Sequence, residues 1–324
     1  MRIVVTGSLA YDYIMNFPGN FKDHILEDKA HVLSVSFLID SMHRMRGGVA
    51  GNIAHTLALL GHRPLVVASA GGDFGEYREW MESRGVDTSG IFEDEEEFTA
   101  SAFINTDEAH NQLVAFYPGA MAHDKDLSLE GFGLGAQDLV IISPTDPEAM
   151  ASYAEECRAL GIPFLFDPGK QTPRLTGEQI LAGLEGAKVL VGNDYEFSMM
   201  SRRTERSEED LISSAPLAVI TRGAEGSVIY ENGQEILQIP VAPISKVVDP
   251  TGAGDAYLAG LAVGIARDLP LEITGRVAAL AAAYVVEHSG PQEHYYTPDE
   301  FAERYTSAFG SSPEIEALAE PARR

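Results

Sequence analysis

The chain has 324 residues, enough for one large α/β domain or two smaller ones with a sizeable core. Its 23 Lys and Arg against 49 Asp and Glu give a net charge of −26, which argues against nucleic acid and anionic membranes as partners, because both bind basic surfaces. No apolar run reaches the roughly 18 residues of a membrane span, and the single cysteine, Cys157, excludes an intramolecular disulfide, so a reducing cytoplasm is the expected location.

Short β-branched runs alternate with helical patterns along most of the chain. This pattern predicts an α/β fold with a doubly wound, mostly parallel sheet flanked by helices. In such sheets ligands bind beyond the carboxyl ends of the strands, where Asp167, Asn193 and Thr221 are expected. The expected strands are Arg2–Thr6, Pro64–Ser69, Leu139–Ile142, Phe164–Phe166, Val189–Val191 and Leu217–Ile220.

Two segments, 12–42 and 92–117, break this alternation because they contain short strand-like pieces without helices between them. They predict a small inserted β-sheet that could cover a site as a lid. The expected strands of this lid are Val32–Phe37, Thr99–Ile104 and Gln112–Phe116. The main nucleotide-binding domain would then comprise residues 1–11, 43–91 and 118–310.

Two further features concern the carboxyl-terminal half. Asn232-Gly233 between the strand-like runs Gly226–Tyr230 and Glu235–Ile239 predicts a β-hairpin. Ser, Pro, Glu and Ala dominate residues 311–324, which predicts a disordered tail.

The most informative stretch is Asp249-Pro-Thr-Gly-Ala-Gly-Asp255, followed directly by the apolar run Ala256–Ile265. Glycines let the backbone turn tightly, and the helix that begins there presents free N–H groups to an anion. A carboxylate beside such a cradle is what phosphoryl transfer to an alcohol requires. From spacing alone, a Gly-rich turn in which Asp255 only caps the helix is an equal alternative.

A second motif, Gly47-Gly-Val-Ala-Gly-Asn52, precedes the first long helix. Together, GGVAGN and DPTGAGD resemble the two signatures of the ribokinase-like (PfkB) kinases in order and separation, and the resemblance spans roughly residues 1–309. Asn193-Asp-Tyr-Glu196 is similar to the N-x-x-E element of that family, and Thr221-Arg-Gly223 with Gly226 to its nucleotide-binding loop. The lid segments 34–40 and 111–119 resemble the prokaryotic nucleoside (adenosine) kinase branch.

The resemblance implies that Asp255 is the base that accepts the proton of the substrate hydroxyl. The backbone N–H groups of Gly252, Ala253 and Gly254 would hold the charge on the transferred phosphoryl group. Because a helix amino terminus favours an ionised carboxylate, we expect Asp255 to be a weak base.

Substrate hydroxyls would contact Asp12 and Asn52 over the floor formed by Gly47 and Gly48. In the lid, aromatic rings can stack on a purine while an amide contacts its edge. The lid residues assigned to this role are Phe37, Gln112 and Phe116, whereas Phe103 is expected in the small core of the lid. Arg44 and Arg46 leave a phosphorylated sugar as an alternative acceptor, because paired arginines can bind a phosphate group.

The resemblance also implies ATP and Mg²⁺. ATP would lie against Thr221, Arg222, Gly223 and Gly226, and Asn193 and Glu196 would act on Mg²⁺ through its water shell. A capping box is the alternative for this last pair. Asp249, with carbonyls near Thr251 and Gly290, could hold a monovalent cation such as K⁺. Lid strands supply dimer contacts in relatives, which leaves a homodimer open.

The expected function is therefore an ATP-dependent kinase that phosphorylates the 5′-hydroxyl of a nucleoside, with adenosine as the leading acceptor. A sugar kinase of the same family, acting on ribose or fructose, is the alternative. A ligand-binding protein without catalytic activity on this fold is a more remote one.

Overall fold

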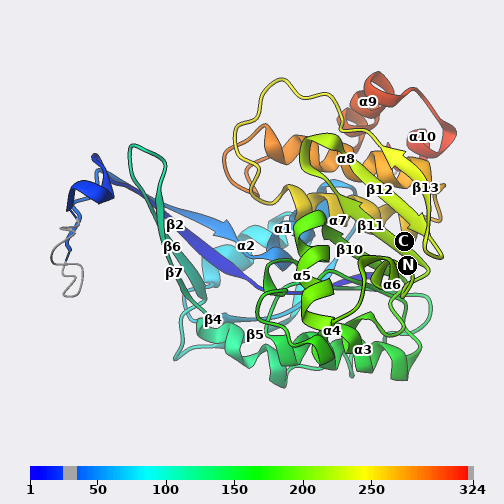
Figure 1. The fold of residues 1–324 in the computed structure, drawn as a ribbon, viewed down its shortest axis with the longest axis horizontal. Coiled ribbons are helices and arrows are strands. Elements are labelled where there is room, and N and C mark those ends of the chain that lie inside the picture. The colour runs from blue at the N-terminus through cyan, green and yellow to red at the C-terminus, as the bar shows by residue number, and fades with distance from the viewer. Residues whose placement is uncertain (25–34, 320–324) are drawn as a thin grey trace.

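The computed structural model describes residues 1–24 and 35–319. Within these residues the chain forms a nine-stranded sheet and a separate four-stranded sheet. The large sheet and its helices make up the main body, and the small sheet projects from one side of that body (Figure 1). Within the same residues, no helix is both long and apolar enough to cross a bilayer.

The large sheet has the strand order β13-β12-β11-β10-β9-β8-β1-β4-β5. All neighbours from β5 to β11 are parallel, and β12 and β13 add an antiparallel edge. This arrangement confirms the expected doubly wound, mostly parallel sheet. The strands are β1 (Ile3–Thr6), β4 (Leu65–Gly71), β5 (Asp87–Asp94), β8 (Leu139–Ile142), β9 (Phe164–Phe166), β10 (Val189–Asn193), β11 (Leu217–Thr221), β12 (Ser227–Glu231) and β13 (Gln234–Ile239).

Helices cover both faces of this sheet, so its central strands are buried on both sides, as their continuous apolar sequences require. Successive residues of β1 point to opposite faces: Val5 packs with one set of helices and Val4 with the other. The first set is α1 (Val49–Leu59), α2 (Gly75–Ser83), α7 (Ala253–Ala266), α8 (Leu271–Val286), α9 (Pro298–Phe309) and α10 (Pro313–Ala319). The second set is α3 (Pro147–Leu160), α4 (Gly177–Leu184), α5 (Asp194–Thr204) and α6 (Glu208–Ile212).

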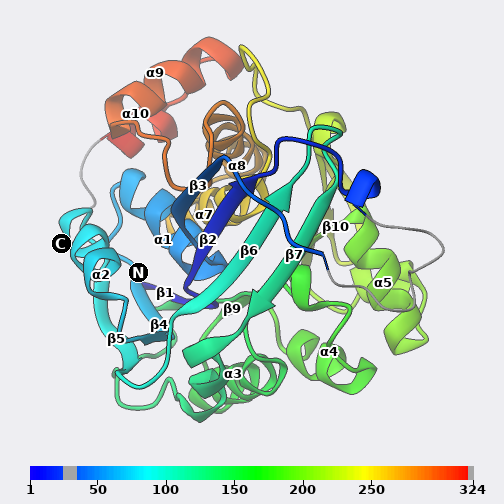
Figure 2. The ribbon, with the colours of Figure 1, turned by 90° about the vertical axis from the view of Figure 1, so that its left-hand side faces the viewer.

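The small sheet has the order β3-β2-β6-β7, and Figure 2 shows these strands side by side. Its strands are β2 (Ala10–Asn16), β3 (Ser41–Gly47), β6 (Ala100–Thr106) and β7 (Gln112–Tyr117). The expected strands at 99–104 and 112–116 are confirmed. The strand expected at 32–37 is wrong where the structure describes it: residues 35–37 form no strand, and 32–34 lie outside the described residues. Instead, β3 pairs with β2.

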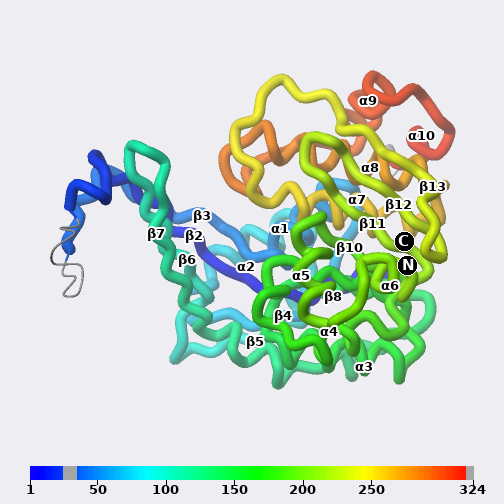
Figure 3. The backbone as a smooth tube through the Cα atoms, viewed as in Figure 1, coloured from blue at the N-terminus to red at the C-terminus, as the bar shows by residue number. Residues whose placement is uncertain are grey.

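The carboxyl-terminal half gives one confirmation and one correction. Asn232 and Gly233 have φ of 49° and 80°, the positive values of a tight hairpin turn between β12 and β13. A long loop, residues 240–252, then leads from β13 to α7 (Figure 3).

The tail expected to be disordered over 311–324 instead forms α10 as far as residue 319, and 320–324 lie outside the described residues. Ile315 and Leu318, three residues apart on one face of the helix, are buried in the main core. The polar composition of this segment concealed a short amphipathic helix.

Candidate active site

A cavity of about 210 Å³ lies where strand ends of the large sheet meet the beginning of α7. Asp167 follows β9, while Asn193 and Thr221 end β10 and β11 and are paired in register. All three line the cavity, as does Asp255. The structure therefore brings the two groups of residues predicted from independent patterns, the strand ends and the Asp249–Asp255 motif, to one place.

The beginning of α7 has the features of an anion site. Gly252 caps the helix with φ of 83°, and a Cβ there would lie 2.5 Å from Cβ of Pro291, so this position requires glycine. In the described part of the chain, the N–H groups of Gly252 and Gly254 have no hydrogen-bond partner, whereas Ala253 donates to the Pro250 carbonyl at 3.2 Å. Two of the three expected N–H groups are thus free to bind an anion beside the cavity.

Asp255 opens onto the cavity and is otherwise enclosed by protein. Asn52 Nδ2 donates to its Oδ2 at 2.7 Å. Burial raises the pKa of Asp255 to about 6, although the hydrogen bond from Asn52 and the charge of Lys170 lower it. The expectation of a weak base is therefore wrong, because desolvation by burial raises the pKa more than Asn52 and Lys170 lower it.

The glycines of GGVAGN allow close contacts where β3 leads into α1. A Cβ at Gly47 would lie 2.7 Å from Asp12 Oδ2, and one at Gly48, where φ is 84°, would lie 2.5 Å from the Ser8 carbonyl oxygen. Asp12 lies within β2, and burial raises its pKa while Lys170 lowers it. Asn52, on α1, therefore contacts Asp255 directly, whereas Asp12 lies on β2 and is not among the residues that line the cavity.

Side chains of the small sheet alternate between its two faces. Asp12 is paired with Ala102, which is paired with Phe116, so Asp12 and Phe116 share one face. Gln112, four residues from Phe116 on β7, lies on the same face, and its amide donates to Thr106 at 3.4 Å. Phe116 is 48% exposed. Both assigned side chains are exposed on the face that carries Asp12, and Gln112 is level with Asn16, at the other end of β2 from the cavity.

The other aromatic residues of the lid pack among themselves. Phe103 stacks on Tyr13 on the opposite face, with ring centroids 4.9 Å apart. Phe37 lies 4.9 Å from both Phe17 and Phe21, centroid to centroid. Phe21 begins η1 (Phe21–His24), which lies at the end of the small sheet far from the main body (Figure 1). The structure therefore does not bring Phe37 to the cavity.

Asn193 and Glu196 form a capping box at the start of α5, with both hydrogen bonds at 2.8 Å. Glu196 nevertheless lines the cavity, and burial raises its pKa. Burial and the nearby charges of Glu196 and Asp255 also raise the pKa of Asp167. In residues 1–24 and 35–319, no three Asp, Glu, His or Cys side chains could hold a metal alone. One or two carboxylates fit Mg²⁺, which completes its shell with water and phosphate oxygens.

The remaining assigned residues, Asp249, Arg222, Gly223 and Gly226, lie in loops next to the lining residues Thr221 and Thr251 but do not line the cavity themselves. Asp249 accepts from the Thr251 N–H at 2.9 Å and from the Gly290 N–H at 3.1 Å, which ties the two loops together. Gly226 has φ of 88°, and its carbonyl accepts from the Arg222 N–H at 2.7 Å. The Arg222 side chain is exposed, as is Gly223 in η5 (Gly223–Glu225).

Comparison with known proteins places the chain in a family. The family model described as pfkB family carbohydrate kinase matches residues 2–298. The chain belongs to the pfkB family. A nucleoside kinase of Methanothermobacter thermautotrophicus is 32% identical over 316 residues, covering 97% of this chain and 98% of the relative.

Two solved structures of a Burkholderia thailandensis nucleoside kinase are similar throughout. The complex with inosine is 34% identical, with a TM-score of 0.84, over 96% of this chain and 99% of that one. The complex described as ADP-inosine is 36% identical, with a TM-score of 0.81, over 96% and 97% of the two chains.

One residue of the candidate site, Lys170, was not predicted from the sequence. It lies in η4 (Gly169–Gln171) and is the only basic side chain among the described residues that line the cavity. Its charge lowers the pKa values of Asp12, Glu196 and Asp255. The signal was present in Asp167-Pro-Gly-Lys170, a run that directly follows a predicted strand.

Arg44 and Arg46, which could have bound the phosphate of a phosphorylated sugar, form ion pairs with other residues. Arg44 pairs with Glu76 at 2.6 Å and Arg46 with Glu293 at 3.3 Å. Arg44 is paired in register with Tyr13, on the face of the small sheet opposite Asp12. These arginines therefore do not favour a phosphorylated acceptor at the candidate site.

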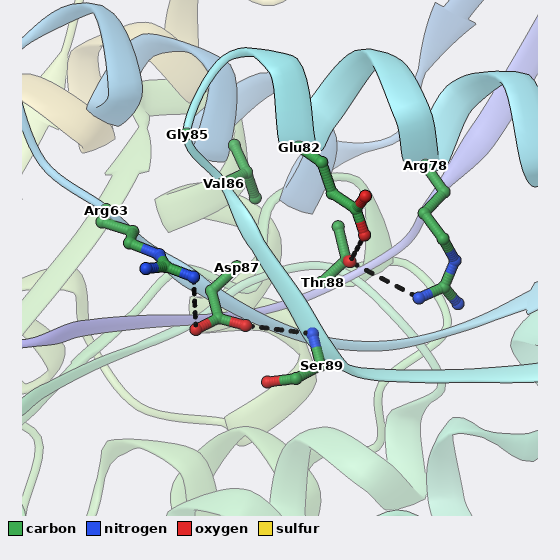
Figure 4. A pocket seen from close by; sticks show the side chains of 8 residues that line it. All are labelled: Arg63, Arg78, Glu82, Gly85, Val86, Asp87, Thr88 and Ser89. Atoms are coloured by element: carbon green, nitrogen blue, oxygen red, sulfur yellow. Dashed lines mark hydrogen bonds and ion pairs between the residues drawn. The ribbon is translucent and has the colours of Figure 1, made fainter.

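A larger cavity, of about 580 Å³, lies at the turn between α2 and β5 (Figure 4). Its charged groups are already paired: Arg63 contacts Asp87 at 3.6 Å, and Arg78 pairs with Glu93. It also lies at the amino end of β5, the wrong end of a parallel sheet for a ligand site. The smaller cavity is therefore the candidate active site.

Proposed function

We propose that this protein is an ATP-dependent kinase that transfers the γ-phosphoryl group to the 5′-hydroxyl of a nucleoside, with adenosine as the leading acceptor. The likeness to nucleoside kinases covers nearly the whole length of both chains. The observation that carries the proposal is local: Asp255 lines one cavity together with Gly252 and Gly254, whose N–H groups have no partner among the described residues.

Asp255 is proposed as the base. Its carboxylate takes the proton of the 5′-hydroxyl as that oxygen bonds to the γ-phosphorus, and the bond from phosphorus to the bridging oxygen breaks to release ADP. A pKa of about 6 leaves the carboxylate mostly ionised at neutral pH and makes it a better proton acceptor than an ordinary aspartate. The free N–H groups at the start of α7 stabilise the charge on the transferred group.

Nucleotide and metal would share the other side of the cavity. Thr221, Arg222, Gly223 and Gly226 are proposed to hold ATP. Glu196 would act on Mg²⁺ through water, with Asp167 as a second carboxylate. A bound Mg²⁺ neutralises phosphate charge in such transfers. Asp249 is proposed to contribute to a monovalent-cation site.

The acceptor is proposed to lie against the face of the lid that carries Asp12, Phe116 and Gln112. A ribose diol suits the Asp12 carboxylate, which can accept two hydrogen bonds. An exposed aromatic ring and an amide on the same face suit a purine base, and the Burkholderia relative was solved with inosine. Adenosine and inosine are therefore the first acceptors to compare.

The test is a coupled assay with MgATP and a panel of adenosine, inosine, ribose and fructose. We expect clear turnover of a purine nucleoside, and Asp255→Ala should lower kcat by about 10²–10⁴. Asp299→Ala is the matched control, because Asp299 is an exposed acid in the first turn of α9. Turnover of ribose or fructose without nucleosides would overturn the substrate assignment, and no ATP consumption with any acceptor would overturn the kinase.

A further inference from the structure

Asn52 connects Asp255 to a buried chain of hydrogen bonds. Its Nδ2 donates to Asp255 Oδ2, and its Oδ1 accepts from Gln292 Nε2, both at 2.7 Å. An asparagine amide has nearly the same shape after a half-turn, which would bring its oxygen against the carboxylate. Something must therefore fix which end of the amide faces Asp255.

Gln292 supplies that constraint. Its Nε2 also donates to Tyr77 Oη at 2.6 Å, so both amide hydrogens are used. Tyr77 Oη donates its only proton to the Gly47 carbonyl at 2.9 Å, a group that can only accept. The hydroxyl oxygen of Tyr77 must then accept from Gln292, which in turn must present N–H groups to Asn52.

The fold buries this series of hydrogen bonds and leaves space for its side chains. Gln292 is 3% exposed and Tyr77 is 1% exposed, so water does not compete for their polar groups. A Cβ at Gly51 would lie 2.0 Å from Tyr77 Oη and 2.9 Å from Gln292 Nε2. Gly51, the third glycine of the GGVAGN motif, therefore leaves space for these two side chains.

We propose that Tyr77 and Gln292 are positioning residues, which hold the Asn52 amide with its NH₂ toward Asp255 and so fix the carboxylate for proton transfer. With Oδ2 held by Asn52, the other oxygen of Asp255 is the one that receives the substrate proton. The inference rests on the proposed role of Asp255 but not on which acceptor the enzyme uses.

The first test replaces Gln292 with methionine, which is similar in size but cannot donate. Losing a donor that orders a charged group should lower kcat about ten-fold, while KM for ATP should stay within about two-fold. The acid limb of the kcat profile should also move to higher pH, because an Asn52 amide free to turn away no longer lowers the pKa of Asp255. The other charged groups that face Asp255, namely Lys170, Glu196 and Asp167, are unchanged in the variant.

Tyr77→Phe is the milder second variant, which keeps the packing and removes only the hydroxyl. Tyr77→Phe should lower kcat and move the acid limb to higher pH, both by less than Gln292→Met does. Tyr153→Phe is the matched control, because Tyr153 is also fully buried and donates to a backbone carbonyl, that of Asp124, at 3.0 Å. It should lose comparable thermal stability while keeping kcat and the pH profile.

The kinetics use whichever acceptor the wild-type enzyme phosphorylates, so a wrong nucleoside assignment does not affect the result. A wild-type chain without kinase activity overturns the proposed function and this role together. If both variants are destabilised like Tyr153→Phe but keep kcat and the acid limb, the function stands and the positioning role is overturned.

Discussion

At the scale of single residues, the charge of Asp255 should control the pH range of activity. A base works only when ionised, so kcat should fall as the pH drops through about 6, the pKa that burial gives this carboxyl. The pH dependence of kcat at saturating MgATP and acceptor measures this directly. A kcat that stays level well below this pH would contradict a proton transfer to Asp255 in the rate-limiting step.

Lys170 gives a second prediction. As the basic side chain that lines the cavity, it is placed to balance the charge of the phosphates and of Asp12, Glu196 and Asp255. Lys170→Met should therefore lower kcat/KM for ATP by about 10²-fold, the range for losing one group that stabilises transition-state charge.

The control for Lys170 is Lys188→Met. Lys188 is an exposed lysine just before β10, at the opposite end of the same sheet. Steady-state kinetics of the two variants separate a local effect from a change in net charge. Equal activity of both variants would show that Lys170 has no part in the reaction.

At the scale of elements, continuous apolar runs made the strands of the large sheet predictable, because burial on both faces leaves a strong signal. The small sheet was predicted only in part. β3 reads Ser-Met-His-Arg-Met-Arg-Gly, and only its last residue is buried, so neither a buried face nor strict alternation marked it. Its pairing with β2 depends on tertiary contacts that no short window of sequence contains.

The residues of the candidate site were likewise predictable only in part. The two glycine motifs fall within short stretches of sequence, so their residues could be assigned from the sequence alone. Tyr77 and Gln292 are 215 positions apart, and only the fold brings them together beside Asn52. The pKa of Asp255 was misjudged for a related reason, because the local helix terminus was visible in the sequence and the burial was not.

The helix α10 offers a prediction at this scale. Ile315 and Leu318 are 1% and 4% exposed, so Ile315→Ala or Leu318→Ala should each lower the free energy of unfolding by about 2–4 kcal/mol. Glu316→Ala, on the exposed face of the same helix, should change it by less than about 0.5 kcal/mol. Urea denaturation followed by fluorescence measures all three, and an equal, small effect would mean that α10 does not pack on the body in solution.

At the scale of the whole molecule, stability depends on carboxyl groups that the fold has buried. Asp124 lies in η3 (Gly119–Asp126), and burial raises its pKa to about 7 even though the Thr145 hydroxyl donates to it. The hydroxyl and N–H of Ser69 also lower this pKa, but burial has the larger effect. Keeping such a group ionised in the native state costs free energy, which adds to the repulsion expected at a net charge of −26.

The sign of the pH effect follows from proton binding. Asp124 ordinarily titrates near pH 4, so between about pH 4 and 7 the native state holds a proton that the unfolded state has lost. Its contribution to stability is therefore present at low pH and is lost as the pH rises through about 7, at up to about 1.4 kcal/mol per pH unit. Asp124→Asn, which is neutral throughout, should remove this slope.

Urea unfolding of wild type and Asp124→Asn at a series of pH values tests the point. Asp167, Glu196 and Asp255 also have raised pKa values, so their effect is common to both proteins and cancels in the difference. That difference should move in favour of the variant as the pH rises from about 5 to 7.5. Parallel curves would mean that Asp124 is already ionised in the native protein, with its charge stabilised by a group or a water molecule at Oδ1.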